Sequence, residues 1–178
     1  MTASVLQRVY LSLGSNIDRE ENILACLDAL AEHFGELIIS PVYESESVGF
    51  AGDSFYNLVV GIDSALSVGE LAVIMRDIET ANKRSRAGPK FGPRTLDIDI
   101  LTYGDLSGVV DGVALPRDEV TENAFVLLPL VDIAPNEKHP VSGKAYCDIA
   151  TNFAGSEQKL WRINFSWQGR TISSKNKN

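Results

Sequence analysis

Two aspartates, Asp97 and Asp99, alternate with apolar residues in the segment 95–101. This alternation predicts a β-strand that carries both carboxylates on one face, while Ile98 and Ile100 point into a core. Carboxylates two residues apart on a strand lie about 6–7 Å from each other, and they repel unless a cation joins them. Because Mg2+ takes oxygen ligands, the pair is a candidate magnesium site.

A cluster of positive charge precedes the two aspartates. Five of the 16 Lys and Arg residues fall between positions 83 and 94, namely Lys83, Arg84, Arg86, Lys90 and Arg94. Arginine side chains bind the phosphate oxygens that a metal leaves free. A solvated basic loop is the alternative interpretation, but the neighbouring aspartates favour an anion site. Together the two groups indicate a magnesium-bound polyphosphate as the ligand.

The composition excludes several classes of protein. The chain has 178 residues, of which 44% are hydrophobic, and a net charge of −8. This length suffices for one domain with a core, and the acidity argues against a general nucleic-acid binder. The longest apolar run, near Phe125, is too short to span a bilayer, and Arg8 interrupts the apolar N-terminal residues. Cys26 and Cys147 have the spacing of neither a disulfide framework nor a zinc site. We therefore expect a cytoplasmic protein with no membrane and no nucleic-acid partner.

Hydrophobic periodicity and turn residues predict the elements that position these side chains. In chain order they are a strand at 9–13, a helix at 18–35, strands at 37–43 and 55–62, a helix from 67 to near 83, and the aspartate strand. Asp18 with Glu21, and Ser67 with Glu70, have the spacing of capping boxes. This order of elements is the split βαβ, or ferredoxin-like, pattern. We expect an α+β sandwich with an antiparallel sheet and helices packed on it.

The remainder of the chain is predicted to divide at residue 155. A short strand at 109–113 and helices at 122–130 and 148–153 complete a first domain, 1–155. Apolar residues from Trp161 to Trp167 then alternate with polar ones, which predicts one additional strand in a C-terminal extension, 156–178. The polar end from Ser173 onward is expected to be a disordered tail.

Four stretches resemble the 6-hydroxymethyl-7,8-dihydropterin pyrophosphokinases, a family of folate biosynthesis. The stretch GPRTLDIDI at 92–100 resembles the central signature of that family, and LSLGSN at 11–16 resembles its opening strand and turn. FYN at 55–57 resembles its third strand, and FVLLPL with DIAP, within 125–135, resembles its closing helix. The resemblance covers residues 8–150.

The resemblance implies transfer of pyrophosphate from ATP to the hydroxymethyl group of a reduced pterin, with release of AMP. It also implies a ferredoxin-like fold, two Mg2+ ions and three mobile loops. By this resemblance the metal ligands are Asp97 and Asp99, and the catalytic arginines are Arg84, Arg86 and Arg94. The ATP site is implied at Glu79, Arg84, Lys90, Phe91, Arg94 and Arg117, and the pterin site at Ser45, Val48, Phe55, Asn57 and Phe125. The expected partners are these two small substrates, and the expected state is a monomer.

The residue types suit this chemistry without the resemblance. Phosphoryl transfer depends mainly on positioning and charge neutralisation, which arginines and a metal pair can provide. Phe55 and Phe125 can form a slot for a flat pterin, with two core phenylalanines as the alternative. Asn57 can hydrogen-bond the pterin edge, or it can satisfy a turn. Glu79 could instead be a helix-surface residue paired with Lys83. The sequence has no Walker A loop, which excludes a P-loop kinase.

A few positions depart from the family pattern. Arg117 stands where the family usually has a histidine, and Asn123 stands where it tends to have an arginine. Gly112 and Ala114 occupy positions at which basic and hydroxyl residues often contact the nucleotide. The leading hypothesis is an active pterin pyrophosphokinase, and the alternative is a non-catalytic pterin- or nucleotide-binding paralogue with a degraded ATP shell. A purely structural ferredoxin-like module would leave the aspartates and the arginine loop as coincidence.

Overall fold

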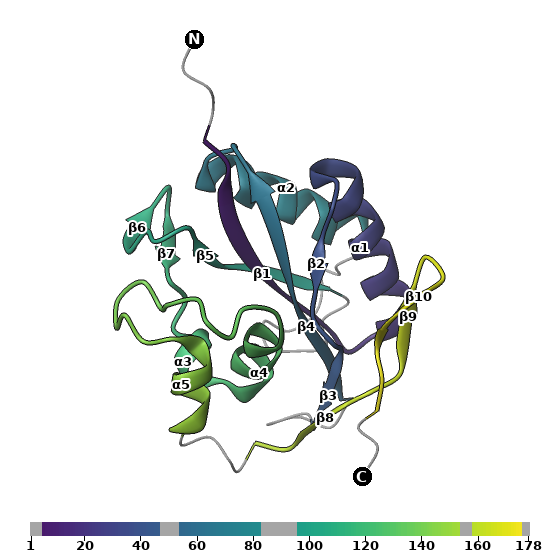
Figure 1. The fold of residues 1–178 in the computed structure, drawn as a ribbon. Coiled ribbons are helices and arrows are strands. Elements are labelled where there is room, and N and C mark those ends of the chain that lie inside the picture. Colours follow the sequence, from purple (N-terminus) through teal and green to yellow (C-terminus); the bar gives the residue numbers. More distant parts are fainter. Residues whose placement is uncertain (1–4, 47–53, 83–95, 154–157, 176–178) are drawn as a thin grey trace.

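The computed structural model describes residues 5–46, 54–82, 96–153 and 158–175 (Figure 1). The elements are, in chain order, β1 (Gln7–Ser15), α1 (Arg19–Phe34), β2 (Ile38–Ile39), β3 (Tyr43–Ser45), β4 (Phe55–Ser64), α2 (Val68–Ala81), β5 (Asp97–Tyr103), β6 (Gly108–Val110), β7 (Val113–Leu115), α3 (Glu119–Glu122), α4 (Ala124–Ile133), α5 (Tyr146–Thr151), β8 (Leu160–Arg162), β9 (Phe165–Trp167) and β10 (Arg170–Ser173).

Within the described residues, the main sheet has six strands: five in the order β5-β1-β4-β3-β8, and β2, which pairs with β4 beside this path. All of its pairings are antiparallel. If β2 and β3 are taken together as the second strand, the chain follows the split βαβ order, with the first and third strands at the centre. The predicted α+β, ferredoxin-like fold is confirmed.

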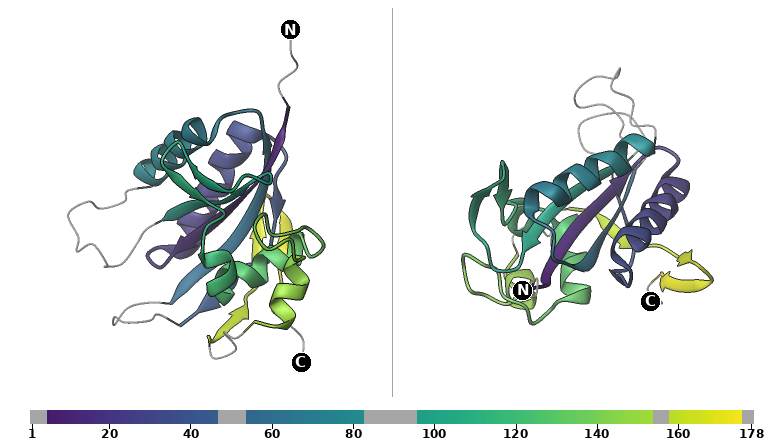
Figure 2. Two further views of the ribbon diagram at one scale, coloured as in Figure 1. Left: turned by 90° about the vertical axis from the view of Figure 1, so that its left-hand side faces the viewer. Right: turned by 90° about the horizontal axis from the view of Figure 1, so that it is seen from above.

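Helices cover both faces of this sheet, as the two views of Figure 2 make clear. Leu11 and Leu13 of β1 belong to the core formed with α1 and α2. Tyr10, the residue before Leu11, points to the opposite face and belongs to a second core that contains Leu130 of α4. One strand serves two cores because successive side chains of a strand point to opposite faces.

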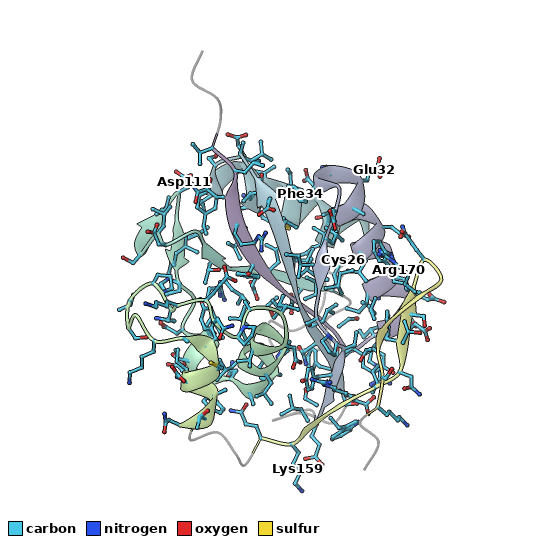
Figure 3. All side chains as sticks on the ribbon, viewed as in Figure 1. Cys26, Glu32, Phe34, Asp111, Lys159 and Arg170 are labelled. Atoms are coloured by element: carbon cyan, nitrogen blue, oxygen red, sulfur yellow. The ribbon has the colours of Figure 1, made fainter. Side chains whose placement is uncertain are left out.

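The two long helices begin in different ways. At α2 the predicted capping box is confirmed, since Ser67 Oγ accepts a hydrogen bond of 3.2 Å from the Glu70 N–H. At α1 the predicted capping box is wrong. Asp18 has φ 43° and ψ 48° and makes no side-chain cap, because a capping side chain needs extended backbone at this position. Within α1, Cys26 is fully buried while Glu32 lies at the outside (Figure 3).

The predicted strand 37–43 is divided into β2 and β3 by Ser40 and Pro41. Proline has no N–H for the ladder, so continuous pairing stops there. The Ser40 hydroxyl replaces part of the ladder, because its Oγ accepts a hydrogen bond of 2.8 Å from the Val59 N–H.

The C-terminal segment joins the main sheet and core. One strand was predicted over 161–167, but the structure has β8, which pairs with β3, and then β9, which forms a hairpin with β10. Gln168 and Gly169 both have positive φ, as a two-residue hairpin turn requires. Phe165 and Trp167 pack in the same core as β1 and α1, and Ser173, predicted to begin a disordered tail, is buried in β10. The division of the chain at residue 155 stays a prediction.

In the described part of the chain, no helix has both the length and the apolar character needed to cross a membrane.

Candidate active site

The ends of three strands bring polar residues together on the face of the sheet opposite α1 and α2. Gly14 in β1 pairs with Asn57 in β4 on one side and with Asp97 in β5 on the other. Ser12, two residues earlier and on the same face, pairs with Asp99. The strand register therefore places both aspartates beside one short stretch of β1, close to the amide of Asn57.

A cavity of about 230 Å³ lies over this row, between the sheet and the N-terminal ends of α3 and α4. It is lined by Ser12, Gly14, Ser45, Phe55, Asn57, Asp97, Asp99, Leu101, Arg117, Glu119, Asn123, Phe125 and Val126. Both aspartates are partly exposed there, whereas Ile98 and Ile100 are each only 5% exposed. The predicted alternation of the strand, with carboxylates on one face and core on the other, is confirmed.

One side of the cavity combines an amide with two aromatic rings. Asn57 is buried, and its Nδ2 donates a hydrogen bond of 3.2 Å to Ser45 Oγ. A Cβ added to Gly14 would lie 3.1 Å from Asn57 Oδ1 and 4.0 Å from the Phe55 ring, so the glycine leaves this part of the cavity open. Asn57 lies inside β4 rather than in a turn. Phe125 lines the cavity and also packs against the second core.

Arg117 lies among carboxylates on the other side of the cavity. Its Nη1 is 3.7 Å from Asp99 Oδ1, and its Nη2 and Nε donate to the two carboxylate oxygens of Glu119 at 3.2 and 3.3 Å. Its backbone N–H donates to the Leu101 carbonyl at 2.9 Å, which ties the residue to β5. Burial lowers the pKa of Arg117, but the hydrogen bond to Glu119 and the negative charges of Asp99, Glu119 and Asp118 outweigh burial and raise that pKa overall. The hydrogen bond from Arg117 lowers the pKa of Glu119.

Glu79 does not line the cavity. It is buried in α2, with 6% of its surface exposed, so the alternative of a helix-surface residue is wrong. Burial raises the pKa of Cys26 on α1, and the negative charge of Glu79 adds to this effect. Six other predicted site residues lie outside the described residues: Val48, Arg84, Arg86, Lys90, Phe91 and Arg94.

Several cavity residues escaped the sequence prediction. Ser12 and Gly14 could have been found from the strand periodicity of the opening motif, which puts them on one face. No pattern in the sequence indicated that Glu119 lines the cavity, because its pairing with Arg117 depends on where α3 begins. Asn123 was considered only as a departure from the family, and it lines the cavity.

The residues present fit a magnesium ion that is shared with a substrate. Among the described residues, no group of three or more His, Cys, Asp and Glu side chains could hold a metal. Magnesium is commonly bound by one or two carboxylates, completed by substrate phosphates and water. Asp97 and Asp99 face the same open cavity, and the Arg117 cation already lies beside Asp99.

Comparison with known proteins identifies the family of this chain. Residues 10–135 match the family 7,8-dihydro-6-hydroxymethylpterin-pyrophosphokinase (HPPK). The chain is 38% identical, over 141 residues, to the 2-amino-4-hydroxy-6-hydroxymethyldihydropteridine pyrophosphokinase of Pseudomonas aeruginosa, covering 76% of this chain and 86% of the relative. It is 33% identical over 140 residues to the protein of the same name from Bacillus subtilis, covering 76% and 83%.

The fold is also similar to solved structures. A Plasmodium falciparum HPPK-DHPS triple mutant with STZ-DHP matches with a TM-score of 0.71 at 16% identity. That match covers 97% of this chain but 49% of the other, so the chain spans about half the length of the Plasmodium protein. At this identity the likeness concerns the fold alone. The sequence match over residues 10–135 and the bacterial relatives decide the family: the chain belongs to the 7,8-dihydro-6-hydroxymethylpterin-pyrophosphokinases.

Proposed function

We propose that this protein transfers pyrophosphate from ATP to the hydroxymethyl group of 6-hydroxymethyl-7,8-dihydropterin and releases AMP, as a step of folate biosynthesis. Family membership supports the reaction and ATP as the co-substrate. The observation that carries the proposal for this chain is one cavity in which an aspartate pair meets two phenylalanines and a buried asparagine.

The aromatic side of the cavity is the proposed pterin site. Phe55 and Phe125 offer two ring faces to a flat heterocycle, and stacked aromatic pairs gain free energy beyond their buried area. Asn57 is oriented by Ser45, and an amide can donate to and accept from the pterin edge. Val48 remains a predicted member of this site. The small space over Gly14 suits a planar ligand that approaches Asn57 closely.

The charged side of the cavity is the proposed phosphate site. Asp97 and Asp99 would hold magnesium, with two ions as the expected number, and the bound metal would neutralise phosphate charge and orient the transferred group. Arg117 supplies a fixed positive charge next to Asp99, and arginine donors suit phosphate oxygens. The reaction forms a bond between the pterin hydroxymethyl oxygen and the β-phosphorus and breaks the α–β bridge of ATP. Donors around the transferred group stabilise this charge shift.

The positively charged residues between positions 83 and 94 are the proposed second source of positive charge for the phosphate site. Arg84, Arg86 and Arg94 are predicted to act in catalysis, and Glu79, Lys90 and Phe91 to contact ATP. Glu79 does not line the cavity, so its proposed contact with ATP would lie in a part of the ATP site beyond that cavity. We further propose that the protein is a monomer and that it acts in the cytoplasm, where ATP and a reduced pterin are both available.

A non-catalytic paralogue is the second candidate function. It is favoured by Asn123, a neutral residue that lines the cavity where the family tends to have arginine. The two candidates differ in a single measurement, the formation of AMP from ATP and the pterin in the presence of magnesium. A paralogue would bind the pterin but form no AMP.

The test of the proposed site uses Asp97→Asn and Asp99→Asn. Each change removes a charged ligand at nearly constant volume, so turnover at saturating magnesium should be abolished while the melting temperature is retained. Asp105→Asn is the matched control, because Asp105 is exposed just beyond the same strand. If either cavity variant keeps activity within about threefold of wild type, the metal assignment is wrong.

A further inference from the structure

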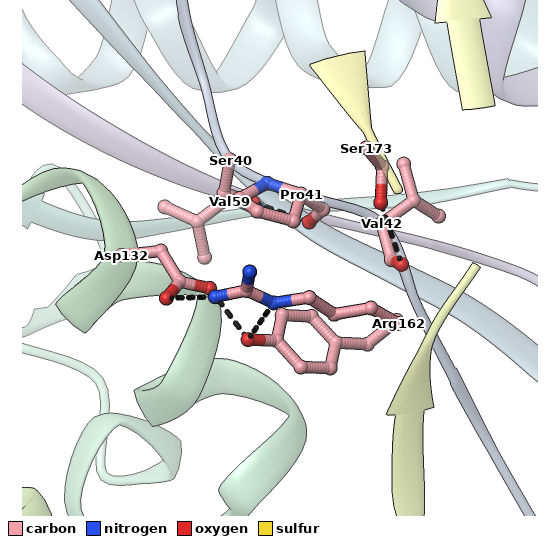
Figure 4. A network of polar contacts seen from close by, with 8 residues as sticks. Ser40, Pro41, Val42, Val59, Asp132, Arg162 and Ser173 are labelled. Atoms are coloured by element: carbon pink, nitrogen blue, oxygen red, sulfur yellow. Dashed lines mark hydrogen bonds and ion pairs between the residues drawn. The ribbon is translucent and has the colours of Figure 1, made fainter. Parts of the chain in front are cut away.

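Arg162 in β8 connects the C-terminal segment to two elements that form the cavity. Its Nη2 donates to Asp132 Oδ1 of α4 at 2.7 Å, and its Nε donates to the Tyr43 hydroxyl of β3 at 3.1 Å (Figure 4). The Tyr43 hydroxyl donates in turn to Asp132 Oδ2 at 2.5 Å. The guanidinium also lies over the Tyr43 ring, 5.7 Å from its centroid. One side chain thus closes a network between β3, α4 and β8.

Gln158 makes a second connection at the opposite end of α4. Its Oε1 accepts a hydrogen bond of 2.7 Å from the N–H of Ala124, the first residue of α4, and its Nε2 donates to the Glu122 carbonyl at 3.3 Å. The first N–H groups of a helix have no partner within the helix. Asn123, the residue before α4, makes no side-chain cap, so Gln158 supplies from a distance what the helix start lacks.

These two connections hold both walls of the aromatic side of the cavity. Ser45, which orients Asn57, lies in β3 directly opposite Leu160 of β8. Phe125 lies in the first turn of α4, next to the N–H that Gln158 binds. The distance between these walls is therefore set partly by the segment 158–162. That segment lies beyond residue 135, where the family match ends.

We propose that Gln158 and Arg162 are positioning residues for the pterin: they fix β3 and the first turn of α4 at the separation that a flat ligand requires. The proposal rests on the proposed function for the identity of the ligand. Neither residue lines the cavity, so both act through Ser45 and Phe125 rather than by touching the substrate. The ATP side should be affected much less, because neither residue contacts Asp97, Asp99 or Arg117 through the bonds described above.

The test compares Arg162→Ala and Gln158→Leu with wild type in steady-state AMP formation and in direct titration with the pterin. The KM and Kd for the pterin should rise about three- to tenfold. Each variant loses one charge-assisted or capping hydrogen bond, and part of the free energy of that bond is expected to be lost from pterin binding. The KM for ATP and kcat should change by less than about twofold. Gln158→Glu should recover most of the affinity, because its carboxylate can still accept from the helix N-terminus.

Asp28→Ala is the matched control for loss of stability. Asp28 Oδ1 accepts a hydrogen bond of 2.9 Å from Trp167 Nε1, so this variant loosens the same C-terminal segment away from the cavity. It should lower the melting temperature without raising the pterin Kd. The proposal is overturned if the Arg162 and Gln158 variants keep the wild-type pterin Kd, or if Asp28→Ala weakens the pterin equally. A wild-type protein that binds the pterin but forms no AMP would contradict the proposed function alone, since the pterin titration tests the positioning separately.

Discussion

Gly14→Ala gives a direct test of how closely the cavity is built around its ligand. The added methyl group would lie 3.1 Å from Asn57 Oδ1, closer than a carbon and an oxygen normally pack, so the amide has to move by a few tenths of an ångström. Asn57 Nδ2 is already 3.2 Å from Ser45 Oγ, and a small rotation would weaken that hydrogen bond. The methyl group would also occupy part of the space that the ligand needs.

The magnitude follows from these two effects. Overpacking of a well-packed site costs roughly 1–3 kcal/mol, and a misaligned hydrogen bond costs about 0.5–1.5 kcal/mol. Because Asn57 can relieve part of the contact by rotating, we expect a loss of about 1–2 kcal/mol in pterin binding, or about 5- to 30-fold in Kd. Overpacking alone should lower the melting temperature by about 2–12 °C. ATP affinity should change little.

Isothermal titration with the pterin, accompanied by a thermal melt, measures both quantities. Gly69→Ala is the matched control, because its added Cβ would lie 3.2 Å from Asp111 atoms but outside the cavity. The control should bind the pterin like wild type. A Gly14→Ala protein that binds the pterin within twofold of wild type would refute the assignment of Asn57 and its surroundings to the pterin.

Three further predictions concern other parts of the molecule. Arg117→Ala should lower kcat/KM by the equivalent of about 2–4 kcal/mol, as for loss of a preorganised donor, while Arg117→His should keep much of the activity. An unchanged kcat/KM in the alanine variant would exclude a role of Arg117 in the transfer. Phe55→Ala or Phe125→Ala should weaken pterin binding by about 1–3 kcal/mol, measured by titration beside a melt, and an equal loss for ATP would indicate general destabilisation instead. Burial lowers the pKa of His139, and the Nδ1 of this residue accepts hydrogen bonds from the N–H groups of residues 141 and 142. The neutral imidazole therefore contributes stability above about pH 6.5, and this contribution is lost as the pH falls through the lowered pKa. The melting temperature should therefore fall as the pH is lowered from 7 to 5, and the melting temperature of the His139→Gln variant should fall less over the same range.

The agreement between sequence and structure is closest where the signal is local. The alternation of Asp97 and Asp99 with isoleucines was enough to put both carboxylates on one face, because side-chain direction along a strand has a fixed period of two. Ser67 followed by Glu70 was enough to locate the start of α2, since a capping box involves only four residues. Asp18 had the same spacing and failed, because its left-handed backbone depends on how β1 leads into α1.

Other parts of the site depend on contacts between distant segments. Glu79 is predicted as a site residue with a surface residue as the alternative, and only the tertiary structure shows that it is buried. His139 follows three polar residues in the sequence and is buried in the structure. Such burial depends on residues that lie far away in the sequence and adjacent in space.

By itself the sequence determined the strand–helix order, the shared face of the aspartates and the family signature, because each of these is written in residues that are neighbours along the chain. The tertiary structure decided that Asn57, Gly14 and Asp97 form one row, since this depends on the register of three strands. It also decided that Arg162 of β8 binds Asp132 of α4, 30 residues earlier in the chain. Register and closure are set by non-local hydrogen bonds and packing, whose partners a local pattern does not identify.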